Sequence, residues 1–322
     1  MFERVFLQKG HLVRPFSQAV GVRCRGYSLP LQRRITDFGA DVPFGKVSEK
    51  LHEHYGIRVP ASSARRITEH HAQRIHEQEC LQSEIPEYAG RACIIAETDG
   101  TMIPILKAVD SEIGAERKDK RKARKGCCKG ARLALTHPQG SVSPVFGGTI
   151  GSPDEVGDQL LNCALRSGLG QASSVHSVGD GAPWIANQVD RVFGTQGEFL
   201  VDFYHLGEYL AAASTACAPN EASLFFATQK QLMKTNQTTT VLNRLKPHIE
   251  PDSVPDDRAP VRCCYRYIHN REGQFNYQEA LEKGLPIGSG EIESAHRYII
   301  QNRLKIAGAW WDEDNAPRTC SH

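Results

Sequence analysis

The sequence predicts a mixed α/β fold in which helices pack on a central sheet. Three features predict it: a buried apolar strand after Arg91, a hairpin of two alternating strands over residues 131–150, and an alternation of helices and strands from Pro153 onward. Antiparallel strands followed by strand–helix alternation form mixed sheets with helices on their faces. The chain has 322 residues, of which 40% are hydrophobic and 24% charged, an ordinary composition for a globular protein.

The N-terminal part divides into two predicted regions. Residues 1–38 contain short β-like runs, VFLQKG and AVGVRCRGYSL, and no clear structural unit. Residues 40–80 predict a helix-turn-helix, because a helical pattern from Lys46 stops at Gly56 and a second helix opens after Pro60. The periodic positions of this second helix predict an inner face of Ala64, Ile67, His71 and Ile75.

The outer face of this second helix is basic and carries Arg65, Arg66 and Arg74. A short turn with a glycine, followed by a basic helix, is typical of a helix-turn-helix that reads DNA. A plain helical hairpin with a solvated charged face fits the same residues equally well.

The stretch ACIIAETDGTMIPILK, from Ala92 to Lys107, predicts a buried strand interrupted by a polar turn at Asp99-Gly100. After it comes RKDKRKARK, in which the charged residues are seven cations and one aspartate. Such a run is either a solvated loop or a binding surface for phosphates, because each cation that neutralises a phosphate releases a counterion. Its candidate DNA contacts are Lys120, Arg121, Lys122, Arg124 and Lys125.

The carboxylate of Asp180 lies between Gly179 and Gly181, after an apolar stretch and before a helix that starts at Pro183. Open α/β sheets build their sites at the carboxyl ends of strands, although Asp180 could simply cap the helix. In a mixed sheet, Asp99 can lie one strand spacing from it, about 5 Å. Carboxylates this close repel each other unless they share a proton or a divalent cation, and magnesium prefers such oxygen ligands.

Four stretches together resemble one family. They are ETDGTMIP around Asp99, GDGAPWI around Asp180, DFYH at Asp202–His205, and IGSGEIESAHRYIIQNRLK from Ile287. In these motifs and their order the chain resembles an ISKra-like insertion-sequence DDE transposase, a group related to Mutator-like elements.

The resemblance implies a ribonuclease-H-like core with a mainly helical insertion before the final acid. The core would comprise residues 90–206 and 287–311, and the insertion residues 207–286. The stretch 312–322 would be an atypical tail, and the chain a truncated copy, because both termini depart from the family pattern.

The resemblance also implies that Asp99, Asp180 and Glu293 are the catalytic acids and hold two Mg²⁺ (or Mn²⁺) ions. Glu293 is chosen over Glu291 because the family's acid lies three residues after the second glycine of Gly-Ser-Gly. Glu291 is then a helix-start acid favoured by the helix dipole. The buried stripe of this helix is predicted at Ile292, Ala295 and Ile299.

Several neighbouring residues have two interpretations. Asp202 is a helix N-cap or part of an Asp-x-x-His pair, in which the resemblance makes His205 a catalytic-site residue that contacts DNA or assists proton transfer. Trp184 packs its helix on the sheet or stacks on a base. Arg297 and Arg303 on the last helix contact DNA or are solvated.

The implied function is cleavage of element ends and their joining to target DNA by two-metal phosphoryl transfer. The partners would be double-stranded DNA, as terminal inverted repeats and target, and a second copy of the chain in a homodimer or higher assembly. The alternatives are a catalytically inert DNA-binding protein derived from a transposase, and a metal-dependent phosphatase or nuclease for small substrates.

Composition limits how the protein could bind DNA or zinc and where in the cell we expect it. The net charge of +2 means that DNA affinity must come from local clusters of cations. Ten cysteines include no Cys-x-x-Cys pair, which argues against a zinc–sulfur site. Without a signal peptide or a membrane-length apolar stretch, we expect a bacterial cytoplasmic protein associated with the nucleoid.

Overall fold

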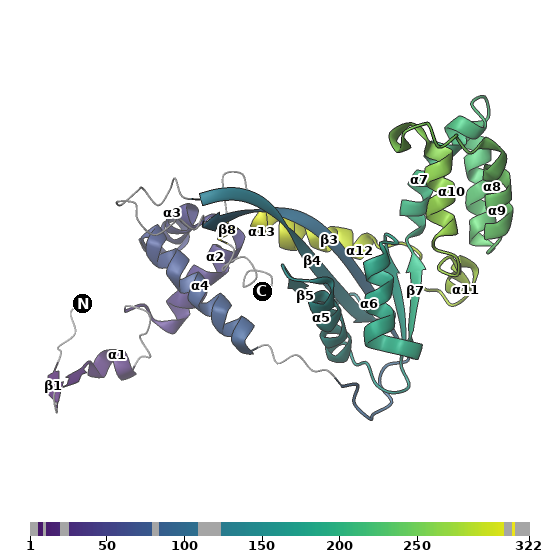
Figure 1. The fold of residues 1–322 in the computed structure, drawn as a ribbon. Helices are drawn as coiled ribbons and strands as arrows, with labels where there is room; N and C mark the ends of the chain where they lie inside the picture. Colours follow the sequence, from purple (N-terminus) through teal and green to yellow (C-terminus); the bar gives the residue numbers. More distant parts are fainter. Residues whose placement is uncertain are drawn as a thin grey trace, which may run out of the picture. The chain divides into compact units, whose positions relative to one another are not determined.

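The computed structural model describes residues 6–8, 11–19, 26–78, 84–108, 124–305 and 311–312 (Figure 1). The chain divides into two compact units. The first comprises Met1–Cys80, Met102–Lys129 and Arg297–His322, and the second comprises Leu81–Thr101 and Gly130–His296.

The first unit contains a group of helices that pack on one another. They are α2 (Leu29–Asp41), α3 (Phe44–Tyr55) and α4 (Ala61–Gln78). Gly56 ends α3 with a φ of +65°, as a glycine does at a left-handed C-cap. The two successive helices and the glycine stop predicted within residues 40–80 are therefore present. The shared core consists of fully buried apolar side chains: Ile35, Val47, Leu51, Val59, Ala64 and Ile67.

The structure corrects two predictions for this unit. Residues 29–38 lie in α2, within the stretch 1–38 for which the sequence predicts no clear structural unit. The buried face of α4 continues through Thr68 and Ala72, whereas Ile75 is 39% exposed. The cause is the close contact of α2 with α4: a Cβ on Gly39 would lie 2.2 Å from the Thr68 hydroxyl oxygen, which turns the Thr68 side of α4 inward.

The remaining elements of the first unit are short, and β1 pairs with β2 in an antiparallel ladder. They are β1 (Phe6–Gln8), β2 (His11–Val13), α1 (Pro15–Ala19), α13 (Asn302–Leu304) and β8 (Trp311–Asp312).

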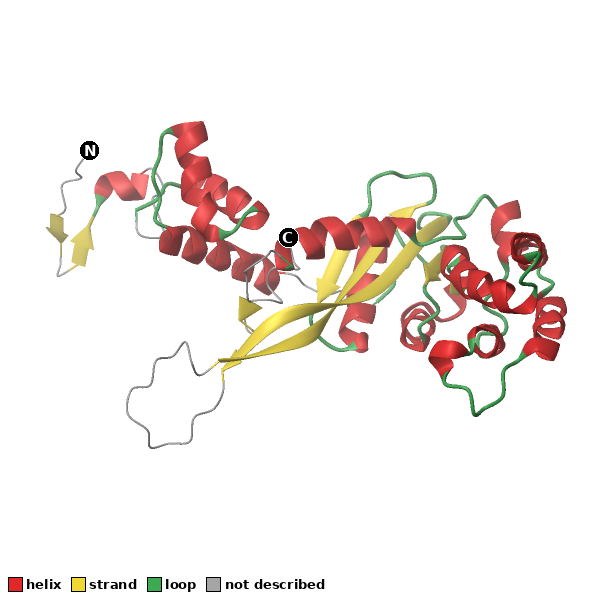
Figure 2. Cartoon of the chain, turned by 90° about the horizontal axis from the view of Figure 1, so that it is seen from above, coloured by secondary structure: helices red, strands yellow, loops and turns green. Residues whose placement is uncertain are grey.

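A mixed sheet forms the centre of the second unit, in the strand order β5-β4-β3-β6-β7. The last part of β3 belongs to the first unit, where Ile105 and Leu106 pair with β8. β3 pairs with β6 and β6 with β7 in parallel, whereas β4 and β5 are antiparallel. The amide of Gln139, just after β4, donates to the carbonyl of Cys93, the first residue of β3, so these two strands are antiparallel as well (Figure 2). The bounds are β3 (Cys93–Ala108), β4 (Arg124–Pro138), β5 (Val145–Thr149), β6 (Ser174–Gly179) and β7 (Gly197–Val201).

The predicted mixed sheet is confirmed, but the turn predicted at Asp99-Gly100 is wrong. β3 continues through both residues into its second half. The Gly100 amide donates to Asp99 Oδ1 at 2.7 Å, and Arg132 of β4 lies beside Gly100. The polar Asp-Gly pair is thus satisfied within a paired strand and needs no turn.

Helices cover both faces of this sheet (Figure 1). On one face lie α5 (Pro153–Arg166) and α6 (Pro183–Phe193), which bury Ile94 and Ala96 of β3. α5 begins as predicted at Pro153, in a capping box between Ser152 and Glu155. Side chains alternate along a strand, so Glu97 and Asp99 point to the other face, where α12 (Gly290–Ala295) lies.

Most of residues 207–286 is helical, in agreement with the predicted composition of the insertion. The helices are α7 (Phe203–Cys217), α8 (Ala222–Lys234), α9 (Thr238–Leu245), α10 (Pro260–His269) and α11 (Tyr277–Glu282). They enclose a core of their own that includes Leu210, Val241, Cys264 and Tyr277, and that also takes in Val201 at the end of β7.

The helix after Gly290 departs from its predicted buried stripe. Ile292 and Ala295 are buried as expected, but Ile300 is buried instead of Ile299. The reason is a π-helical segment, His296–Gln301, whose wider turn shifts the inward face by one residue.

Several predicted positions lie outside what the structure describes. Lys120, Arg121 and Lys122 of the basic run are among them, as are residues 313–322 of the predicted tail. Arg124 and Lys125 open β4, and Arg303 lies in α13, without described side chains. In the part of the chain that is described, no helix combines the length and apolar character needed to cross a membrane.

Candidate functional site

The structure places Asp99 and Asp180 at neighbouring positions of paired strands. β3 and β6 pair in parallel from Cys93 opposite Ser174 to Glu97 opposite Val178. Continuing that register by two residues sets Asp99 opposite Asp180, as the sequence predicted. Burial raises the pKa of the Asp99 carboxyl, and the negative charge of Asp180 raises it further, while His296 opposes the shift.

Each of these two carboxylates accepts a hydrogen bond from a nearby backbone amide. Asp99 Oδ1 accepts from Gly100, and Asp180 Oδ1 accepts from Ala182 at 2.8 Å. The N-cap residue of α6 is Ala182, so Asp180 closes an Asx turn before the helix and is not its N-cap. These bonds use one oxygen of each carboxylate.

Two residues of α10 and the loop after it hold the Asp180 loop in place. The hydroxyl of Tyr267 donates to the Asp180 carbonyl at 2.7 Å, and Arg271 Nε donates to the Gly181 carbonyl at 2.6 Å. The Arg271 guanidinium also lies over the Tyr267 ring, 3.9 Å from its centre. Gly181 has a φ of +81°, and a Cβ there would lie 2.6 Å from Arg271 Nε, so a glycine is required.

Glu97 and His296 lie on the same face of the sheet as Asp99. His296 is buried, and its Nε2 lies 3.2 Å from Asp99 Oδ2. Glu97 is only 1% exposed and accepts a hydrogen bond from the Ile292 amide at 2.7 Å. Burial raises the pKa of Glu97 to about 8, assisted by the negative charges of Glu291, Asp202 and Glu293.

The two glutamates of α12 have different surroundings. Glu291 pairs with the buried His137, with 3.3 Å between Oε2 and Nε2. Glu293, the predicted third acid, is exposed next to Ile292. Over the described ranges, no three His, Cys, Asp or Glu side chains gather closely enough to form a metal-binding group. The structure therefore brings Asp99 and Asp180 together and leaves Glu293 outside such a group.

Asp202 is the N-cap of α7, which is one of the two roles that the sequence predicts for it. Its Oδ1 accepts from the amides of Tyr204 at 2.6 Å and His205 at 2.9 Å. The His205 ring packs edge-on against Tyr209 and Tyr267, with Nδ1 3.7 Å from a Glu208 oxygen. A positive charge on His205 would lower the pKa of Asp99. The His205 imidazole therefore interacts electrostatically with the acid pair, Asp99 and Asp180, through Asp99.

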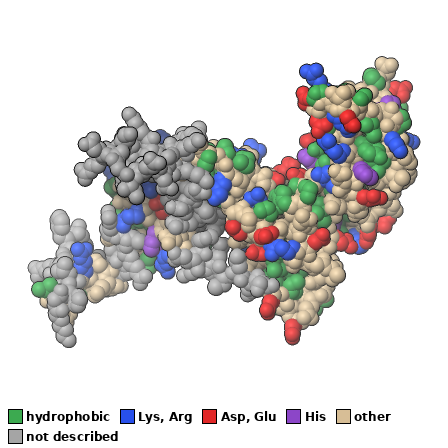
Figure 3. Space-filling view, viewed as in Figure 1, with side chains coloured by type: hydrophobic (Ala, Val, Ile, Leu, Met, Phe, Trp, Pro, Cys, Tyr) green, Lys and Arg blue, Asp and Glu red, His purple; other side chains and the backbone are tan. Residues whose placement is uncertain are grey.

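The predicted DNA contacts that the structure describes lie on helices of the first unit. Arg65 pairs with Glu69 at 3.0 Å, Arg66 is half-buried, and Arg74 and Arg297 are exposed. In the view of Figure 3, the drawn Lys and Arg side chains are scattered among Asp and Glu rather than gathered in one patch.

Trp184, at the start of α6, lies against the sheet beside Gly100. Its Cζ2 atom would be 3.7 Å from a Cβ on that glycine. The Arg132 guanidinium stacks on its ring at 5.4 Å and donates to the Gly151 carbonyl. The packing interpretation of Trp184 is thus the one these contacts support.

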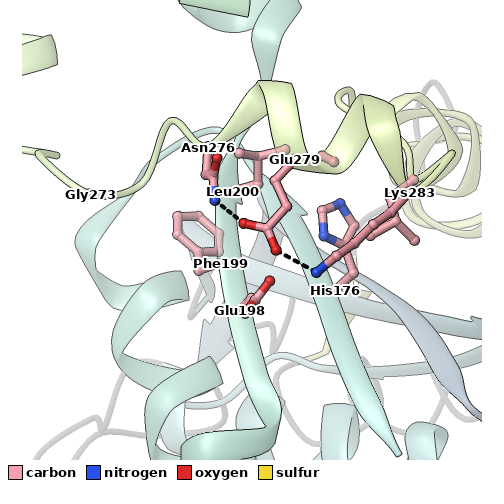
Figure 4. A pocket seen from close by; sticks show the side chains of 10 residues that line it. His176, Glu198, Phe199, Leu200, Gly273, Asn276, Glu279 and Lys283 are labelled. Carbon is pink, nitrogen blue, oxygen red and sulfur yellow. Dashed lines mark hydrogen bonds and ion pairs between the residues drawn. The ribbon is translucent and has the colours of Figure 1, made fainter. Parts of the chain in front are cut away.

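A separate hollow lies at the other edge of the sheet, where β6 and β7 begin (Figure 4). It has a volume of about 220 Å³. Glu279 on its wall pairs with Lys283 at 2.5 Å and accepts from Asn276. His176 Nε2 lies 2.8 Å from the Pro286 carbonyl, and burial lowers the pKa of His176. The His176 contact attaches the segment after α11 to the sheet, whereas the Glu279 contacts are local to α11 and its ends.

Sequence reasoning missed Glu97, Tyr267, Arg271 and His296. A usable signal existed only for Glu97, because strand alternation sets it on the same face as Asp99 two residues later. Comparison with known proteins adds no further assignment: no protein-family model and no curated protein sequence matches this chain.

Proposed function

We propose that this chain is a DDE transposase of an insertion sequence that cuts element ends and joins them to target DNA. The observation that carries the proposal is the acid pair, Asp99 and Asp180, which lie opposite each other where β3 continues past the end of the parallel strand β6. The sheet supports a ribonuclease-H-like core, since an antiparallel run, β5-β4-β3, is followed by the parallel strands β6 and β7.

The residues of the site have distinct proposed roles. Asp99 and Asp180 each accept a backbone hydrogen bond through one carboxylate oxygen, and at the second oxygen of Asp99, Oδ2, a metal ion would take the place of His296. Carboxylate oxygens are the ligands that Mg²⁺ or Mn²⁺ prefers. Glu293 would be the third ligand, since α12 is bonded to β3 through Glu97 on the face of Asp99. Two bound ions would supply a nucleophile at neutral pH and stabilise charge on the phosphate oxygens. His205 would contact DNA or accept a proton at its imidazole.

DNA would be held by cations of the first unit. We propose that α3 and α4 act as the helix-turn-helix for terminal inverted repeats, through Arg65, Arg66 and Arg74. The basic run with Lys120, Arg121, Lys122, Arg124 and Lys125, and the last helical segment with Arg297 and Arg303, would contact the phosphate backbone. Two element ends must be processed together, so the active form would be a homodimer or larger on DNA.

One observation favours the alternative of an inert, transposase-derived DNA-binding protein. His296 occupies Asp99 Oδ2 at 3.2 Å, and Glu293 is exposed rather than directed to the acid pair. In that case the helices of the first unit would bind DNA while the acid pair is inactive.

Cleavage and strand transfer on DNA carrying the element's own ends separate these functions. The assay compares the wild type with Asp180→Asn in Mg²⁺ or Mn²⁺, and Asp190→Asn serves as the matched control because Asp190 is an exposed acid on α6. Metal-dependent nicking that is lost in Asp180→Asn and retained in Asp190→Asn supports the transposase. End-specific binding without nicking by all three proteins supports the inert alternative.

A further inference from the structure

The first turn of α12 is held by two carboxyl groups from elsewhere in the fold. Its N-cap residue, Ser289, makes no side-chain capping bond within the helix. Asp202 Oδ2 instead accepts from both Ser289 N at 2.6 Å and Ser289 Oγ at 2.5 Å. Glu97 accepts from the Ile292 amide. Amide groups that would otherwise be orphans at a helix start therefore have partners from two other elements.

Both carboxyl groups are buried where unpaired polar groups are costly. Glu97 is 1% exposed and Asp202 3% exposed, and Ser289 is buried as well. Asp202 accepts four hydrogen bonds in all, two from the start of α7 and two from Ser289. Burial of a carboxyl group costs free energy unless hydrogen bonds within the protein replace those it makes with water. These contacts therefore fix the local geometry.

Glu97 and Asp202 are also linked to the strands that carry Asp99 and Asp180. Glu97 precedes Asp99 by two residues on β3. The amide of Asp202 donates to the carbonyl of Gly179 at 2.7 Å, and Gly179 directly precedes Asp180. The segment before α12 packs closely against the start of α7, because a Cβ on Gly288 would lie 2.6 Å from the Tyr204 ring.

We propose that Glu97 and Asp202 are positioning residues that set the first turn of α12, and with it Glu293, against the strands of Asp99 and Asp180. The inference rests on the proposed function for its catalytic consequence. Neither residue acts on DNA or metal itself: each acts through a hydrogen bond to the backbone of α12 or of Ser289.

Two substitutions of Glu97 test whether the hydrogen bond is what matters. Glu97→Gln retains an oxygen that can accept from Ile292, whereas Glu97→Met fills similar space without an acceptor. We expect Glu97→Gln to cleave DNA ends within about threefold of wild type. Glu97→Met should slow single-turnover cleavage on the order of 10²-fold, as a displaced catalytic group does, with an unchanged Kd for the ends.

Asp202→Asn gives a second, independent test. Its amide has one oxygen for two sets of donors, so it loses either the α7 bonds or the Ser289 bonds. Cleavage should fall while end binding persists. Cleavage by Glu97→Met or Asp202→Asn at the wild-type rate would overturn the proposal. Loss of cleavage in Glu97→Gln would overturn it too, because the charge rather than the bond would then be required.

Hydrogen exchange separates failure of this inference from failure of the proposed function. In the full chain without DNA, peptides covering residues 289–295 should exchange faster in Glu97→Met than in wild type, and at the wild-type rate in Glu97→Gln. If the wild type cleaves no DNA, the proposed function fails, and exchange alone decides the positioning role. Equal exchange in all three proteins would then contradict it.

Discussion

Tyr267, on α10, is bonded to the loop of Asp180 through its hydroxyl group. Its bond to the Asp180 carbonyl spans 87 positions of sequence, and burial raises the pKa of this phenol well above its usual range. The hydroxyl therefore stays protonated and donates at all working pH values. It fixes the backbone of Asp180 rather than its carboxylate.

Replacement of Tyr267 by Phe should affect both stability and catalysis. Loss of one buried hydrogen bond lowers the free energy of unfolding by about 0.5–1.5 kcal/mol. Ser214→Ala is the control, because the buried Ser214 hydroxyl donates to the Leu210 carbonyl at 2.6 Å within α7, away from Asp180. Urea unfolding should show similar losses for both variants, and end cleavage should fall only in Tyr267→Phe. Equal cleavage by the two would show that the Asp180 loop needs no such support.

His176, which lines the hollow beside β6 and β7, makes the stability of the protein depend on pH. Burial lowers its pKa below the ordinary 6.5, so the folded state favours the neutral ring while the unfolded chain binds the proton more readily. The stabilisation from neutral His176 is therefore fully present above 6.5, the ordinary pKa of the unfolded chain's histidine, and is lost as the pH falls below that value. Urea unfolding should give a smaller free energy at about pH 5 than at pH 7, and His176→Gln should reduce that difference. An unchanged difference would contradict the assignment.

At the scale of elements, α4 is the helix on which the DNA proposal depends. Arg74 is exposed on it, and Arg65 is already paired with Glu69. Exposed pairs of this kind contribute little to stability, so the cations remain available to phosphates.

Arg74→Ala should weaken DNA binding without unfolding the helix group. If Arg74 contacts one phosphate, the slope of log K against log salt concentration should decrease by about 1. Binding is measured by fluorescence anisotropy over a range of salt, with Arg166→Ala as control because Arg166 is an exposed cation on α5 of the second unit, outside the proposed DNA contacts. An identical slope for wild type and Arg74→Ala would remove α4 from the interface.

Elements with strong local signals were predictable. α5 has Pro153 at its first position, inside the capping box of Ser152 and Glu155, and the hairpin of β4 and β5 follows from alternation around a turn. β3 was misjudged because Asp99-Gly100 is a turn signal that pairing with β4 overrides. The π-helical segment was missed because the extra residue in its turn has no sequence signature.

At the scale of the whole molecule, the acid pair was predictable and its supports were not. Strand order and the position of Asp180 after an apolar stretch sufficed to place it beside Asp99. Tyr267, Arg271 and Ser289 lie 87 to 90 positions in sequence from the residues that they bond, which are Asp180, Gly181 and Asp202, and local patterns carry no information on such contacts.

The proposed reaction requires two element ends in one complex. Mixing two end fragments of different length with the protein should give complexes that contain both lengths, resolved by native electrophoresis. Paired complexes support assembly of at least two chains on DNA, since each chain would hold one end. Complexes with one fragment length only, at every protein concentration, would contradict the assembly.

The central claim, that Asp99 and Asp180 form a divalent-metal site, is tested most directly by Mn²⁺ binding followed by electron paramagnetic resonance. The wild type and Asp180→Asn are compared, with Glu291→Gln as control because Glu291 pairs with His137 on the same face. The account predicts that Asp180→Asn weakens Mn²⁺ binding by about tenfold or more, since even outer-shell changes can have such an effect, and that Glu291→Gln does not. Equal Mn²⁺ affinity in wild type and Asp180→Asn would contradict it.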